Sequence, residues 1–198
     1  MPYPKDHKQK TRARIVEAAR QLFNTHGYDR VTLDMAMQAA GLTRGAFYAH
    51  FRSKEALFAA SVDSFLMGRG AEWRSAAGVD PTVREVVMAE RMIDAYLGDE
   101  HLSDLAGQCP LIALSSDVAR SSDEVRESYQ KLLSAMIWLF EVNRAEEARE
   151  ARENAMAMAA LCVGGMILAR TLPADGLADD VRRAAHRMAR EYCRSEAA

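Results

Sequence analysis

The chain has 198 residues, of which 49% are hydrophobic and 27% are charged, and its formal net charge at pH 7 is −2. This composition suits one or two folded domains with a packed core. No apolar run approaches the length of a membrane span, and residues 1–10 lack the apolar stretch of a signal peptide, so we expect neither membrane insertion nor export. Three cysteines without a metal-type spacing predict a reduced, cytoplasmic protein.

Short apolar periods separated by glycines and capping residues predict four helices in the first third of the chain. Their expected ranges are about 8–26, 32–40, 43–50 and 53–68, after a loose arm at residues 1–7. Gly27 is expected to end the first helix, and Ser53 to cap the fourth. The glycine-rich residues 68–78 should loosen the fourth helix and act as a hinge, so that this helix carries motion along the molecule.

The remaining residues are also predicted to be helical, and nothing in them is typical of a strand. Start signals for three helices are Asp80 before Pro81, Cys109 before Pro110, and the capping box Ser121-x-x-Glu124. The second of these helices should end near residue 120 and the third near residue 142. Two further helices are expected at about 146–170 and 177–194, and the chain is therefore predicted to be all-α.

The basic residues are concentrated at one end of the chain. Residues 1–54 hold ten Lys and Arg against four Asp and Glu, a net charge of +6, which leaves −8 for residues 55–198. A basic head on an acidic body is typical of a protein that meets phosphate with one end only. Chance clustering of solvated charges is the alternative interpretation.

Residues 32–51 form the most specific pattern in the chain. The apolar side chains that share one face of the first helix in this stretch are Leu33, Ala36, Met37 and Ala40. Gly41 suits the positive φ at which a helix stops, and Thr43 is a good N-cap for the next helix. Phe47 and Phe51 are expected to pack that helix onto its neighbours. This order predicts a helix-turn-helix.

Further features extend this pattern in both directions. In chain order they are Ile15, Ala18, Ala19, Leu22, Phe23, Gly27-Tyr28, Thr32, Ala40-Gly41-Leu42-Thr43, Gly45, Tyr48-x-His50-Phe51 and Ser53-Lys54-Glu55. With them, residues 11–58 resemble the DNA-binding region of the TetR family of bacterial transcriptional regulators. Close family members often have Gly where Ala46 stands and a large aliphatic residue where Ala36 stands. Alanine is the better helix former, and a neighbouring methionine can fill the smaller volume.

The resemblance implies an all-α protein with an N-terminal three-helix DNA-binding domain, residues 1–54, joined to a helical ligand-sensing and dimerisation domain, residues 55–198. It implies a repressor that binds a palindromic double-stranded DNA operator as a homodimer and is released by a small-molecule or thiol-reactive effector. Two late helices of each chain, 122–142 and 146–170, would pair as a four-helix bundle. Gly164 and Gly165 fit a place where backbones approach closely. A monomer with a core helix is the alternative.

Seven residues of the basic end are candidates for contact with DNA: Thr32, Thr43, Arg44, Gly45, Tyr48, His50 and Lys54. Arg44 can form two hydrogen bonds to guanine and is expected to recognise the base sequence. Tyr48 and His50 should reach phosphates, although Tyr48 could instead pack and His50 could bond the backbone. Thr32 and Lys54 stand at helix N-termini, where the dipole favours phosphate.

An apolar effector pocket is expected among the helices of the second domain. Its candidate lining residues are Phe65, Trp73, Met88, Met92, Tyr96, Cys109, Leu111, Tyr129 and Trp138. Each of them could equally be an ordinary core residue. Cys109 is expected at a helix N-cap, where the dipole would lower the thiol pKa and favour a reactive thiolate. A small buried hydrophobic residue is the alternative for Cys109.

Two other functional classes, an enzyme and an architectural DNA-binding protein, compete with the repressor. The five histidines are scattered, and the chain has no HExxH sequence, no phosphate-binding glycine loop and no carboxylate and histidine cluster, so we expect no enzyme, no metal and no cofactor. The other rival is a constitutive or architectural DNA-binding protein without an effector. Arg44 in a recognition helix argues against it. The expected partners are operator DNA, a second copy and an unidentified small molecule, and no membrane.

Overall fold

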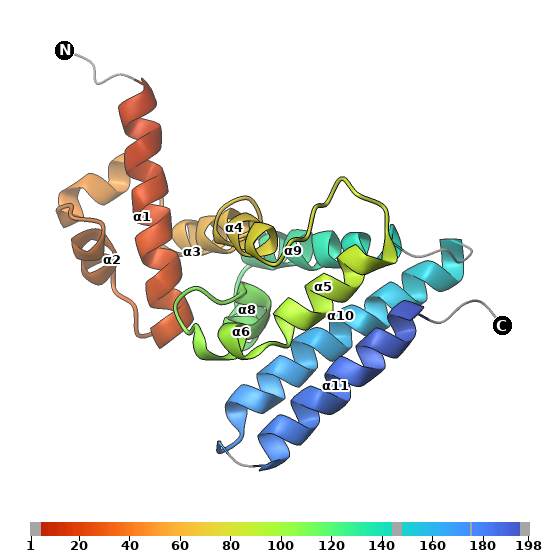
Figure 1. The fold of residues 1–198 in the computed structure, drawn as a ribbon. Coiled ribbons are helices and arrows are strands. Elements are labelled where there is room, and N and C mark those ends of the chain that lie inside the picture. Colours follow the sequence, from red (N-terminus) through yellow and green to blue (C-terminus); the bar gives the residue numbers. More distant parts are fainter. Residues whose placement is uncertain (1–4, 144–147, 175, 195–198) are drawn as a thin grey trace.

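Every regular element is a helix in residues 5–143, 148–174 and 176–194, the parts of the chain that the computed structural model describes (Figure 1). In chain order these elements are α1 (Lys5–His26), α2 (Leu33–Ala39), η1 (Arg44–Ala49), α3 (Lys54–Ser64), α4 (Arg69–Ala76), α5 (Val86–Tyr96), α6 (Asp99–Ser103), α7 (Pro110–Ala113), α8 (Ser115–Ala119), α9 (Asp123–Glu141), α10 (Ala148–Thr171) and α11 (Gly176–Arg194). The predicted all-α fold is confirmed. We call α1, α2 and η1 the head and α4 to α11 the body, with α3 between them.

The head folds as the sequence predicts, around one apolar core. Gly27 ends α1 with φ +77°, and Gly41 makes the turn after α2 with φ +66°. The Thr32 hydroxyl caps α2 by accepting the Met35 N–H at 3.2 Å. Large side chains buried in this core are Ile15, Phe23, Met37 and Phe47 of the head and Leu57 and Phe58 of α3.

The element after the turn is a short 3-10 helix, although an α-helix was expected at 43–50. Thr43 is its N-cap residue, but its side chain makes no capping hydrogen bond, so the expected cap is wrong. Phe47 and Phe51 are buried as predicted. Because η1 is only six residues long, the packing of these two rings holds it in place more than its own hydrogen bonds do.

The helix expected at 53–68 is shorter, and a separate helix, α4, begins at Arg69 after a turn at residues 65–68. Ser53 caps α3 as predicted, accepting the Ala56 N–H at 3.0 Å, but α3 ends at Ser64. The Gly70 N–H donates to the Phe65 carbonyl at 2.8 Å, and a Cβ on Gly70 would lie 2.6 Å from that oxygen. This close approach turns the chain into α4. The expected hinge at residues 68–78 is therefore mostly helix, and the break lies at residues 65–68.

Two of the three start signals were wrong, and the third, Cys109 before Pro110, opens a shorter helix than expected. Asp80 accepts hydrogen bonds from the Thr82 N–H at 2.8 Å and the Thr82 hydroxyl at 2.7 Å, so it forms a turn and α5 starts later, at Val86. The expected helix at 110–120 is interrupted at Leu114 into α7 and α8. Ser121 does not cap α9; the N-cap is Ser122, whose side chain makes no capping bond.

The body is a layered bundle in which α10 and α11 pack against each other along their length (Figure 1). A Cβ on Gly165 would lie 2.5 Å from the Ala185 Cβ, so this glycine permits the close crossing of α10 and α11 within one chain. Helix α9 packs against α3 on one side and α10 on the other. Its apolar residues Leu132, Met136 and Phe140 are buried in the chain's own core, so the expected dimer role of helix 122–142 is wrong.

Glu150–Thr171 of α10 is long and apolar enough to cross a membrane by length and composition, so the expectation that no apolar run has this length is wrong. Within it, Met158, Cys162 and Met166 are fully buried in the body core. A core helix of a soluble protein satisfies the same length and composition criterion, and the buried residues account for this apolar run by packing.

Candidate DNA-binding head and ligand pocket

The outer surface of η1 presents Thr43, Arg44 and Gly45 to solvent. The Arg44 guanidinium donates to the Asp34 carboxylate of α2 at 2.8 Å, and both side chains are about 60% exposed. An exposed ion pair of this kind contributes only about 0–1 kcal/mol to stability. Arg44 can therefore leave Asp34 at little cost and turn toward a base edge.

The second half of η1 carries Tyr48 and His50. Tyr48 is 66% exposed, so the alternative of a packing aromatic is wrong. The His50 Nδ1 is buried and finds no hydrogen-bond partner among the described residues. Burial lowers the pKa of His50, and the nearby charges of Lys8 and Arg12 lower it further. These two α1 cations beside His50 were missed in the sequence, although their spacing of four places them on one helix face.

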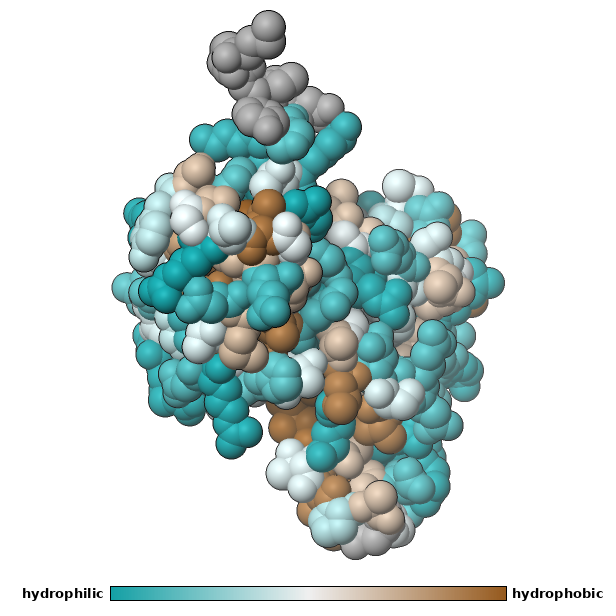
Figure 2. Space-filling model, turned by 90° about the vertical axis from the view of Figure 1, so that its left-hand side faces the viewer, coloured by the Kyte–Doolittle hydropathy of each residue, from teal (hydrophilic) through white to brown (hydrophobic). Residues whose placement is uncertain are grey.

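Two further candidates stand at helix starts and already have partners. The Thr32 hydroxyl caps α2. The Lys54 ammonium lies 4.1 Å from the centroid of the Tyr28 ring, and burial lowers the pKa of Lys54. Phosphate contact by either residue remains a prediction. Figure 2, in which the head faces the viewer, shows a surface of mainly hydrophilic side chains around this region.

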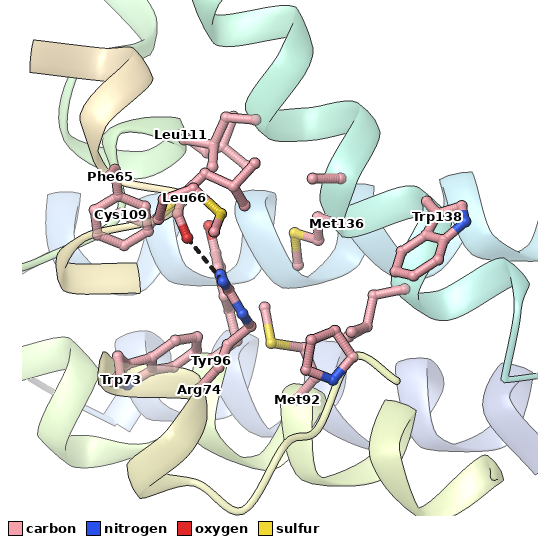
Figure 3. A pocket seen from close by; sticks show the side chains of 15 residues that line it. Phe65, Leu66, Trp73, Arg74, Met92, Tyr96, Cys109, Leu111, Met136 and Trp138 are labelled. Atoms are coloured by element: carbon pink, nitrogen blue, oxygen red, sulfur yellow. Dashed lines mark hydrogen bonds between the residues drawn. The ribbon is translucent and has the colours of Figure 1, made fainter. Parts of the chain in front are cut away.

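A cavity of about 200 Å³ lies in the body (Figure 3). The predicted residues that line it are Phe65, Trp73, Met92, Tyr96, Cys109, Leu111 and Trp138. Phe65 directly follows α3, Trp73 lies in α4, Met92 and Tyr96 lie in α5, Cys109 and Leu111 lie at the start of α7, and Trp138 lies in α9. The expectation of an apolar pocket in the body is therefore supported by the geometry.

Two predicted lining residues do not reach the cavity. The sulfur of Met88 accepts the Asp80 N–H at 3.3 Å, and the Tyr129 hydroxyl donates to the Leu111 carbonyl at 2.8 Å. Both side chains thus support residues around the cavity without lining it. Helical spacing identifies an apolar face but does not tell which members of that face meet a cavity.

Several lining residues were missed: Leu66, Met67, Arg74, Pro81, Leu132, Ala135, Met136 and Leu139. Leu132, Met136 and Leu139 recur at helical spacing in α9, which is a usable signal, but the sequence interpretation assigned that face to a dimer interface. Arg74 gives no such signal, because a charged side chain is not expected in an apolar pocket.

Cys109 occupies the N-cap of α7, as expected, but its predicted reactivity is wrong. Its side chain is buried, and burial raises the pKa of the thiol to about 11. Helix α7 has four residues, so its dipole is short. The Cys109 N–H donates to His101 Nε2 at 3.2 Å, and His101 Nδ1 lies 2.8 Å from the Tyr96 carbonyl. His101, which the sequence interpretation overlooked, therefore orients two residues of the pocket wall.

The loop that leads into Cys109 also holds the head. The Asn24 side chain of α1 donates to the carbonyls of Ala106 at 3.0 Å and Gln108 at 2.8 Å. Arg20 is fully buried and donates to the same Ala106 carbonyl at 3.0 Å. We call these contacts of α1 with residues 106–108 the head–body joint. Gln108 also bonds Arg170 of α10 through its side chain.

Other bonds fasten the head and the start of α3 to α8 and α9. The Tyr28 N–H donates to the Asp117 carboxylate at 3.1 Å, and the Ser122 N–H donates to the Glu55 carboxylate at 3.0 Å. Arg52 forms an ion pair with Glu124. The head core itself includes Leu114, Val118 and Val125 from the body. Packing therefore continues across the proposed domain boundary at residues 54–55.

Comparison with known proteins agrees with this arrangement. Residues 15–61 match the family described as bacterial regulatory proteins, tetR family. The repressor Rv1474c of Mycobacterium tuberculosis is 45% identical over 53 residues, and the regulator TtgR of Pseudomonas putida is 47% identical over 60 residues. These matches span 27% and 30% of this chain, and 28% and 29% of the relatives' own lengths.

Solved structures extend the similarity to the whole fold. The reduced form of Escherichia coli NemR has a TM-score of 0.71 at 18% identity, covering 91% of this chain and 95% of that one. A TetR transcriptional regulator of Chloroflexus aurantiacus has a TM-score of 0.70 at 22% identity, covering 94% and 96%. Head sequence and overall fold agree: residues 15–61 match the DNA-binding region of the TetR family of bacterial transcriptional regulators, and the whole fold is similar to that of solved TetR-family regulators.

Proposed function

We propose that the chain is a ligand-responsive repressor that binds palindromic operator DNA as a homodimer and releases it when an apolar molecule enters the body cavity. The observation that carries this proposal is the head–body joint. Asn24 and Arg20 hold α1 to residues that immediately precede Cys109 in the cavity wall. A ligand that displaces this wall would therefore displace α1 and the orientation of the head.

In the proposed complex, η1 enters the major groove of DNA. Arg44 recognises a base, while Tyr48 and His50 contact phosphates with help from Lys8 and Arg12 on α1. Thr43 and Gly45 lie at the end of η1 that would approach the bases. Thr32 and Lys54 are placed at phosphates beside the N-termini of α2 and α3.

The proposed dimer forms through α10 and α11. These helices share an outward hollow lined almost entirely by apolar side chains and glycines: Ala157, Ala160, Leu161, Gly164, Gly165, Leu168, Val181, Ala184, Ala185, Met188 and Tyr192. Leu168 is 51% exposed, and a Cβ on Gly164 would meet nothing within 4 Å. Figure 2 shows hydrophobic side chains gathered toward the lower end of the molecule. The two views differ by a turn about the vertical axis, and Figure 1 shows one end of the α10 and α11 pair at this height. A two-fold partner would cover this face and set the two heads about 34–36 Å apart for successive major grooves.

The proposed effector acts by favouring a head spacing that does not fit the operator. Coupling of this kind typically amounts to about 1–3 kcal/mol, and it is reciprocal between effector and DNA. Cys109 takes part as a member of the cavity wall, since its high pKa leaves it as a neutral thiol at pH 7. We therefore propose a non-covalent effector in place of the thiol-reactive one.

The test is to sequence the DNA fragments that the purified protein retains from a random pool. The proposal expects enrichment of one palindrome, and specific binding that survives excess competitor DNA. Uniform retention of all sequences would instead support the architectural alternative. Operator binding that no cavity ligand changes would support a constitutive repressor.

A further inference from the structure

Arg74 of α4 is the one charged residue that the described chain places in the lining of the cavity. Its guanidinium donates to the Leu66 carbonyl at 2.7 Å (Figure 3), and among the described residues no carboxylate forms an ion pair with it. Burial is the main cause that lowers the pKa of Arg74, yet a guanidinium stays charged in proteins. The cavity therefore holds a positive charge that no carboxylate of the described residues neutralises.

Tyr96 supplies a second polar group in the same wall. Its side chain is 99% buried, and its hydroxyl forms no hydrogen bond with a described residue. The thiol of Cys109 lies beside this hydroxyl without forming a hydrogen bond of ordinary geometry. Burial raises the pKa of Tyr96 well above its ordinary value, so the hydroxyl remains a donor. A buried donor without an acceptor costs about 1–3 kcal/mol.

Arg74 and Tyr96 meet at one part of the cavity. The Cys109 thiol interacts electrostatically with both, and the charge of Arg74 opposes the rise that burial causes in the thiol pKa. The rest of the cavity is apolar, and Figure 3 shows Met92 and Met136 between Arg74 and Trp138. Figure 3 shows the Arg74 guanidinium with Cys109 on one side and Met136 on the other.

We propose that the ligand of this cavity is a small apolar molecule with one anionic acceptor group, a carboxylate or its equivalent. The acceptor binds Arg74 and receives the hydrogen bond of Tyr96, while the apolar part lies along Met92 and Met136. The proposal rests on the proposed effector function and names its ligand class. A neutral ligand leaves the Arg74 charge unpaired, and a cationic one adds repulsion, so both are disfavoured.

Three probes with one chain length and different head groups test this assignment: octanoate, 1-octanol and octylammonium. Calorimetry measures their affinities, and fluorescence of Trp73 and Trp138 in the cavity lining reports where they bind. We expect octanoate to bind at least about tenfold more tightly than 1-octanol, and octylammonium to bind most weakly. Equal or tighter binding of 1-octanol, or no binding of octanoate, would overturn the proposal.

Substitutions separate a binding role of Arg74 from a structural one. Arg74→Met should weaken the binding of octanoate by roughly 10- to 100-fold and leave the affinity for 1-octanol unchanged or higher. Arg74→Lys, which keeps the charge, should keep the preference for the anion. Arg91→Met is the matched control, because this guanidinium also donates to a backbone carbonyl, that of Gly78 at 2.8 Å, and does not line the cavity. An Arg74→Met protein that still prefers octanoate would refute the assignment.

Tyr96→Phe provides a second test that removes one hydroxyl and keeps the ring. This substitution should weaken the binding of octanoate several-fold and reduce the ratio of its affinity to that of 1-octanol. The test can be made even if Arg74→Met lowers the melting temperature of the protein. An unchanged ratio of the two affinities would show that the Tyr96 hydroxyl does not bind the anionic group. Operator binding by the wild-type protein is measured in parallel, without any probe. If the wild type does not bind an operator, the proposed repressor function is wrong, but the ligand class is unaffected.

Discussion

The side chain of Asn24 donates to the Gln108 carbonyl at 2.8 Å, and Gln108 is bonded directly to Cys109 in the cavity wall. Asn24 lies in the last turns of α1, the helix against which α2 and η1 pack. The hydrogen bond therefore joins a head helix to the cavity wall across one peptide unit. This short connection makes the transmission of ligand binding to the head testable.

Asn24→Ala should weaken the response of operator affinity to a cavity ligand. The substitution removes donors from two carbonyls of the joint and should cost about 1–3 kcal/mol in the free energy of unfolding. Gln21→Ala is the control, since Gln21 is exposed and bonds only Glu17 of its own helix. Operator titrations with and without ligand measure the coupling. Full coupling in Asn24→Ala would show that the signal takes another route.

Arg44→Ala should relax the base preference at one position of each half-site and cost about 1–3 kcal/mol per contact. Lys54→Ala should weaken binding to all sequences alike and reduce the salt dependence, because its ammonium would meet only phosphate. Binding-site selection with each variant distinguishes the two effects. The assignment of roles would be wrong if the two variants gave the same change in selected sequence.

Leu168→Glu should shift the protein from dimer to monomer, because it places a charge in the apolar face that we assign to the partner. Operator affinity should fall with it, since a monomer contacts one half-site. Leu105→Glu is the matched control, because this leucine is about as exposed as Leu168 and lies outside both that face and the cavity lining. Sedimentation equilibrium at micromolar concentration measures the association. A wild-type monomer, alone and with DNA, would contradict the dimer itself.

His101→Gln should reduce the loss of stability in acid. Burial lowers the pKa of His101, so below about pH 6.5 the unfolded chain binds a proton that the folded chain resists. The free energy of unfolding therefore falls as the pH falls toward the folded-state pKa, by at most about 1.4 kcal/mol per pH unit. Above about pH 6.5 the contribution of His101 no longer depends on pH. Protonation would also remove the acceptor for the Cys109 N–H.

Urea unfolding at pH 7.5 and at pH 5.5 measures this effect. The pKa of His50 is lowered in the same direction, but His50 is present in both proteins, so the difference between wild type and variant reports His101 alone. Equal pH dependence in the two proteins would show that His101 makes no contribution.

Cys109 should react slowly with alkylating agents in the folded protein at pH 7, because its side chain is buried and its thiol pKa is about 11. Cys162 should react more slowly still, since burial raises its pKa further. In denaturant both should react at the rate of an ordinary thiol. Mass spectrometry after timed labelling gives the rates, and rapid labelling of native Cys109 would restore the case for a chemical trigger.

Local signals in the sequence were sufficient for the head. The glycines at 27 and 41 take positive φ, Ser53 and Thr32 cap their helices, and the apolar face of α2 is buried as its spacing predicts. These features depend on neighbours within a few residues. The 3-10 form of η1 was missed because the packing of its aromatic residues, and no capping signal, determines its geometry.

Capping signals in the body were less reliable, because the groups that they involve are engaged elsewhere, either with another segment or in a local turn. Glu55 accepts the Ser122 N–H at the start of α9, and Asp80 is engaged in a turn. The face of α9 was assigned to a partner because helical spacing records that a face is apolar, but not what covers it. Here α3, α10 and the cavity cover it.

The sequence by itself determined the helical class, the helix-turn-helix, the resemblance of the head to a known family and half of the apolar residues of the cavity, because these follow from short-range periodicity and residue chemistry. Only the tertiary structure decided the rest. It buried Cys109 and thereby raised its pKa, placed Arg74 and Tyr96 in one apolar wall, and joined Asn24 to that wall. Burial and electrostatic surroundings depend on segments that are distant in the chain, so no local pattern contains them.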